Sequence, residues 1–97
     1  MKEEFDPIVA KAILISFMKK HFGEFVGLQF LKIQLTEFGI TSFRGMDKQT
    51  FEFFVDFLFK NLLRKYHSKE DVRFMKIALL AKVFGKEGAI KITSQRL

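Results

Sequence analysis

The two histidines, His21 and His67, are the side chains of this sequence best suited to acid–base or metal chemistry near neutral pH. Each stands where we expect a helix to end, close to basic residues that the negative end of a helix dipole favours. A metal site needs further ligands on the same face. The nearest are Glu24, three residues after His21, and Asp71, four residues after His67. A predicted helix boundary separates the members of each pair, so we expect structural histidines and predict no metal site.

Other combinations of catalytic side chains are weak. The chain has no cysteine, which excludes thiol catalysis, disulfides and cysteine-ligated zinc. Its serines lie outside any G-x-S-x-G pattern, and the sequence has no phosphate-loop or EF-hand motif. Glu52 and Asp56 are one helical turn apart, but Lys60 and Arg64 continue the same stripe, which is typical of a solvated helix face. We therefore expect neither catalysis nor a cofactor.

Basic residues form the one polar cluster that stands out. Residues 1–50 carry a net charge of +1, whereas residues 51–97 carry +5. Two helices joined by a short turn and followed by a candidate strand are the order of a helix-turn-helix or winged-helix domain, although the second helix lacks the amides that read bases. The alternative is a basic face that keeps a Phe-rich protein in solution. The nucleic-acid candidates are Arg64, Lys65, Lys69, Arg73, Lys76, Lys91 and Arg96.

Turn and capping residues divide the chain into four predicted helices. Asp6 followed by Pro7 is a strong helix start, and Asp47 and Ser68 are placed to cap two later helices. Gly27, inside the second helix, indicates the close approach of a neighbouring helix. We expect one compact all-α domain over residues 1–97, with a C-terminal tail that is a candidate strand at residues 89–93. The expected helices cover residues 7–22, 24–38, 48–66 and 69–84.

The third and fourth predicted helices have more apolar surface than one core face needs. The core sector of the third runs from Phe51 through Val55 to Tyr66, and other phenylalanines fall outside it. Residues 69–84 present two apolar faces, one of which contains Phe74. We expect a homodimer to cover the surplus. The alternatives are a central helix in a monomer, a Phe-lined cavity for an apolar ligand, and a different protein partner. The interface candidates are Phe53, Phe54, Phe57, Val72, Met75 and Leu79.

The remaining features bear on location and on one loop. The longest run without a charged residue is seven residues, whereas a membrane-spanning helix needs about 20. The N-terminal Met-Lys-Glu-Glu is acidic where a signal peptide is basic. In the loop of residues 40–46, Phe43 and Arg44 form either an exposed pair for a partner or a plug for the bundle end.

Together, these features predict a small cytoplasmic, non-enzymatic association module, either a homodimer or an adaptor for another protein. The first alternative is a regulator that binds nucleic acid through the basic cluster. The second is a binder of an apolar ligand in a Phe-lined cavity. We expect no interaction with membranes.

Overall fold

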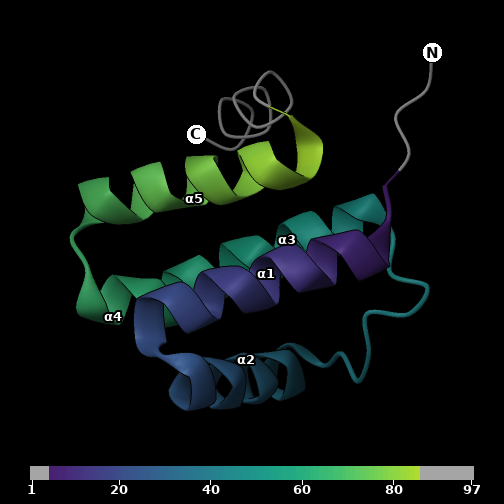
Figure 1. The fold of residues 1–97 in the computed structure, drawn as a ribbon, viewed down its shortest axis with the longest axis horizontal. Coiled ribbons are helices and arrows are strands. Elements are labelled where there is room, and N and C mark those ends of the chain that lie inside the picture. Colours follow the sequence, from purple (N-terminus) through teal and green to yellow (C-terminus); the bar gives the residue numbers. More distant parts are fainter. Residues whose placement is uncertain (1–4, 86–97) are drawn as a thin grey trace.

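A computed structural model describes residues 5–85 of the chain, and its regular elements in that range are helices (Figure 1). The third predicted helix is a continuous run of three elements. The all-α, four-helix prediction is confirmed with the expected boundaries, while the predicted tail strand at 89–93 lies outside the described residues. The elements are α1 (Pro7–Phe22), α2 (Glu24–Phe38), α3 (Lys48–Leu58), η1 (Phe59–Leu63), α4 (Arg64–Tyr66) and α5 (Lys69–Phe84).

Side-chain caps fix where α1, α3 and α5 begin. The Asp6 carboxylate accepts hydrogen bonds from two backbone N–H groups in the first turn of α1, at 2.9 and 3.4 Å. Asp47 accepts one at the start of α3, at 2.8 Å, and the hydroxyl of Ser68 accepts one at the start of α5, at 3.1 Å. Each bond satisfies an N–H group that the helix itself leaves without a partner. The predicted capping residues therefore act as expected.

The third helix changes its pitch halfway along. From Phe59 to Leu63 the backbone forms a π-helical turn, with hydrogen bonds between residues five apart instead of four. Each residue of such a turn advances by less than the roughly 100° of an α-helix. Leu63, which an uninterrupted helix would place about 120° from Phe51, thereby turns toward the core and is fully buried. Tyr66, which the periodicity of the sequence predicts on the core face, is instead 58% exposed.

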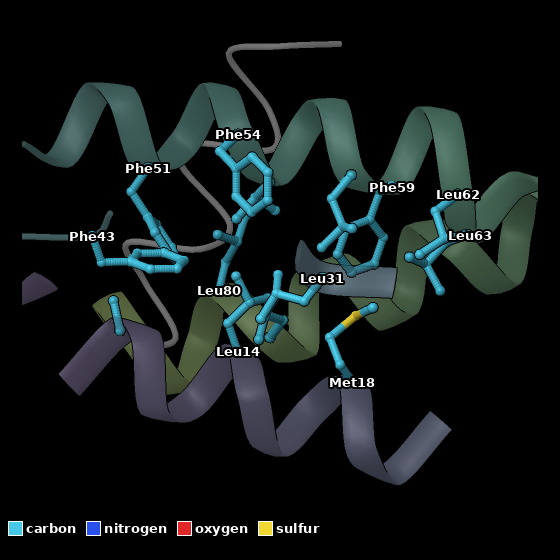
Figure 2. Packing of buried hydrophobic residues seen from close by; sticks show 14 of the residues in the cluster. Leu14, Met18, Leu31, Phe43, Phe51, Phe54, Phe59, Leu62, Leu63 and Leu80 are labelled. Atoms are coloured by element: carbon cyan, nitrogen blue, oxygen red, sulfur yellow. The ribbon is translucent and has the colours of Figure 1, made fainter. Parts of the chain in front are cut away.

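The core lies between α1 and the α3–η1 run. Figure 2 shows Leu14 and Met18 of α1 pointing toward the phenylalanines of α3 and η1. α1 packs against α2 on one side and against α5 on the other (Figure 1). The largest fully buried side chains are Leu14, Met18, Phe51, Phe54, Val55, Leu58, Phe59, Leu63, Leu79 and Leu80.

Three of the predicted interface residues belong to this core. Phe54 is fully buried, and Val72 and Leu79 are also buried. The ring of Phe54 lies 5.4 Å from that of Phe38 and 6.2 Å from that of Phe43. In a single copy, the chain's own core therefore covers these three side chains. The helical-wheel prediction assumed that the third helix has one core face. In the structure, other segments pack against several faces of this helix, as in the central-helix alternative.

The loop between α2 and α3 closes one end of the core. Phe43 is 3% and Met46 8% exposed, whereas Arg44 is exposed. The backbone N–H of Arg44 donates to the hydroxyl of Ser42 at 3.0 Å, which stabilises the turn. Phe43 therefore plugs the bundle end and is not presented to a partner.

The α1 and α2 backbones approach closely at Gly27. A Cβ atom at this position would lie 2.5 Å from the carbonyl oxygen of Met18 and 3.0 Å from the backbone nitrogen of Lys19. A Cβ contact of 2.5 Å is essentially never seen, so any larger residue here would push the two helices apart. The close approach predicted from Gly27 is confirmed.

Candidate functional site

A groove of about 300 Å³ lies on the surface between α1 and α5. On each helix the side chains that line it are neighbours or are spaced three or four residues apart, which places them on one face. The lining residues are Ser16, Phe17, Lys20 and His21 from α1 and Phe74, Met75, Ala78, Leu79 and Lys82 from α5.

The groove combines an apolar lining with basic side chains. Met75 is half-buried, whereas Phe74 is 66% exposed. The titratable residues that line the groove are Lys20, His21 and Lys82, and all three are exposed. A large exposed aromatic side chain next to cations suits a ligand with an apolar face and acidic groups.

His21 connects the groove to a row of aromatic rings. Its ring centroid lies 4.4 Å from that of Phe17 and 6.3 Å from that of His67. The structure thus brings together two histidines that the sequence placed on separate helix ends. Partial burial lowers the pKa of His21, and the positive charges of Lys20 and His67 lower it further. Within residues 5–85, no group of three or more metal-ligating side chains is found.

The lowered pKa of His21 predicts a pH-dependent stability. Protonated His21 is less favourable in the folded chain than in the unfolded chain. The contribution of neutral His21 to the free energy of unfolding is therefore complete above the pKa of the unfolded chain, about 6.5. This contribution is lost as the pH falls through the lowered pKa of the folded chain. We expect a small decrease in the free energy of unfolding between about pH 7 and pH 5, and a smaller one in His21→Gln. Urea unfolding at both pH values measures the difference, and an identical decrease in the two proteins would contradict the assignment.

The other interface candidates lie in three different places. Phe53 of α3 is 45% exposed. Phe57 is half-buried, with its ring 5.2 Å from that of Phe38 of α2. Met75 lines the α1–α5 groove. The six candidates therefore form no single surface, and self-association through Phe53 stays a prediction.

The residues of the predicted basic cluster do not all lie on one free surface in the folded chain. Lys76 is half-buried and forms an ion pair with Asp56 of α3, which links α5 to α3. This pair engages a cation that the helix-turn-helix hypothesis assigned to DNA. Lys91 and Arg96 lie outside the described residues, and nucleic-acid binding stays a prediction. The exposed members of the cluster are Arg64, Lys65, Lys69 and Arg73.

The groove was not predicted as a unit from the sequence. Lys20 and Lys82 are 62 positions apart, and no local pattern shows that their helices are neighbours. No family model, curated protein or solved structure matches the chain. Among the described helices, none has both the length and the apolar character needed to cross a membrane.

Proposed function

We propose that this protein is a non-enzymatic association module that binds an acidic amphipathic helix of another protein in the groove between α1 and α5. One observation carries the proposal: Phe74, 66% exposed, lines a groove whose three titratable side chains are all basic. Aromatic residues are enriched at protein interfaces, and basic rims select acidic partners.

A helix suits this groove because the walls of the groove are themselves helices. Apolar side chains spaced three or four residues apart on the partner would fill the space above Met75 and Ala78. Acidic side chains beside them would reach Lys20 on one wall and Lys82 on the other. Such charge pairs would favour an acidic partner over a basic one and would speed its association with the groove.

The charge distribution favours a different protein over a second copy of this chain in the groove. A two-fold contact would place Lys20 and Lys82 close to the same lysines of the other copy. Like charges facing each other across an interface reduce affinity. The net charge of +6 would also attract an acidic partner at long range.

The test is fluorescence anisotropy with a labelled synthetic helix that carries Leu and Phe on one face and Glu on its flanks. A peptide with Lys in place of each Glu is the matched control. We expect the acidic peptide to bind with a Kd of about 1–100 µM at low salt, to bind more weakly as salt increases, and to be preferred over the basic one. Phe74→Ala should weaken binding about tenfold. Lys20→Glu combined with Lys82→Glu should reverse the preference.

Phe53→Ala is the control variant, because Phe53 is 45% exposed but does not line the groove. Random duplex DNA in the same assay tests the nucleic-acid alternative. DNA binding that is lost in Arg73→Ala and retained in Phe74→Ala would favour that alternative. Peptide binding that is unchanged by both Phe74→Ala and the charge reversal would contradict the proposed function.

A further inference from the structure

Folding concentrates positive charge at the end of the molecule where α1 meets α4 (Figure 1). Residues 19–24 carry a net charge of +1 and residues 60–73 a net charge of +3, with the histidines neutral. Ring contacts join these two segments, from Phe22 to Tyr66 at 5.6 Å and from His21 to His67 at 6.3 Å between centroids. The two segments together therefore hold +4 of the chain's net charge of +6.

Tyr66 places an exposed aromatic ring among these charges. Its side chain is 58% exposed. The centroid of its ring lies 6.2 Å from that of Phe30, with the ring planes 28° apart, and Phe22 meets it edge to face. Both phenylalanines are half-buried and pack against the core. Two anchored rings thus hold Tyr66 in place, so a ligand that packs on its exposed side costs little side-chain entropy.

The basic residues nearest to Tyr66 in the chain are free to bind an anion. They are Arg64, Lys65 and Lys69. All three are exposed and, unlike Lys76, none of them forms an ion pair within residues 5–85. Each lies within three positions of Tyr66, close enough for a ligand on the ring to reach them as well. None of these side chains lines the α1–α5 groove.

The combination of an anchored ring and free cations selects one class of polyanion. A nucleic-acid base offers a flat face that stacks on an aromatic side chain, whereas a carboxylate or a lipid headgroup does not. A single strand suits this surface better than a duplex, in which the bases are already stacked on each other. The exposed Glu70 and Asp71 in the first turn of α5 would also repel a duplex lying along that helix.

We infer that this end of the molecule binds single-stranded nucleic acid, with one base stacked on Tyr66 and the adjacent phosphates beside Arg64, Lys65 and Lys69. Contacts to three phosphates and one base give a Kd of about 1–100 µM at low salt. The inference does not depend on the proposed function, because the two surfaces use different side chains. Phe74→Ala should leave strand binding unchanged, and Tyr66→Ala should leave peptide binding unchanged.

The test uses the intrinsic fluorescence of Tyr66, which is the single tyrosine of a chain without tryptophan. The probes are a 12-nucleotide oligothymidine, the same strand with abasic sites in place of every base, and a duplex of equal length. We expect the oligothymidine to quench Tyr66 and to bind at least about tenfold more tightly than the abasic strand. Its affinity should fall about 10–20-fold between about 50 and 200 mM salt. An oligouridine of the same length tests whether RNA binds equally well.

Fluorescence anisotropy with labelled strands extends the test to variants. Tyr66→Ala should weaken oligothymidine binding about tenfold, whereas Tyr66→Phe, which keeps the aromatic face, should bind like the parent. Replacing the three cations beside Tyr66 with glutamine should remove most of the salt dependence. The matched control removes the same charge elsewhere and should retain most of the binding. It replaces the exposed Lys11, Arg44 and Lys48 with glutamine.

Three results would overturn the inference. The first is equal binding of the oligothymidine and the abasic strand without quenching of Tyr66, which would show a surface that binds any polyanion. The second is duplex binding as tight as that of the single strand. The third is unchanged strand binding in both Tyr66→Ala and the glutamine variant of the three cations. Because the first two results come from the unmutated protein, they do not depend on whether the variants fold.

Discussion

Phe54→Ala is expected to lower the free energy of unfolding by about 3–5 kcal/mol, the usual result of truncating a fully buried phenylalanine. Phe54 has no exposed surface, and its ring contacts Phe38 from α2 and Phe43 from the loop. Removing the ring leaves a cavity where three segments of the chain meet. Because those segments are anchored by other core residues, the cavity cannot close fully. Urea unfolding followed by circular dichroism measures the loss.

Phe53→Ala is the matched control, since Phe53 is the adjacent residue on the same helix and is 45% exposed. We expect this variant to lose less than about 1 kcal/mol. If Phe54 acted at a dimer interface, its effect on stability would depend on protein concentration. The core assignment therefore predicts the same loss at low and high concentration. Equal losses in the two variants, or a concentration-dependent loss in Phe54→Ala, would contradict it.

The helix boundaries were predictable because capping is local. Asp6, Asp47 and Ser68 each accept a hydrogen bond from an N–H group two or three residues further along the chain. A signal of this kind depends on residue type and spacing, and both are visible in the sequence. Gly27 was informative for a similar reason, since a glycine inside a helix is unfavourable unless another group needs the space.

The faces of the helices were less predictable, because they depend on which elements become neighbours. A helical wheel with a constant 100° per residue placed Phe54 outside the core. In the structure, α2 and the loop cover that side of α3. The π turn changes the period itself, and Leu63 is buried as a result. The groove depends on the pairing of α1 with α5, so no segment of the sequence contains its pattern.

Gly27→Ala is the second substitution with a large expected effect. The added Cβ would lie 2.5 Å from the carbonyl oxygen of Met18. The obstacle is backbone, which cannot rotate away as a side chain does, so α2 must move outward from α1. Forcing extra volume into a tight contact lowers the free energy of unfolding by about 1–3 kcal/mol. The better helix propensity of alanine offsets up to about 1 kcal/mol of this loss. We expect a net loss of about 1–2 kcal/mol in urea unfolding.

Larger side chains at position 27 should extend this series, because each further carbon increases the displacement of α2. Gly27→Val should therefore be less stable than Gly27→Ala. Lys32→Ala is the control on the same helix, since Lys32 is exposed and its loss should change the free energy of unfolding by less than about 0.5 kcal/mol. A Gly27→Ala protein as stable as the parent would mean that the two helices cross with more space than the structure gives them.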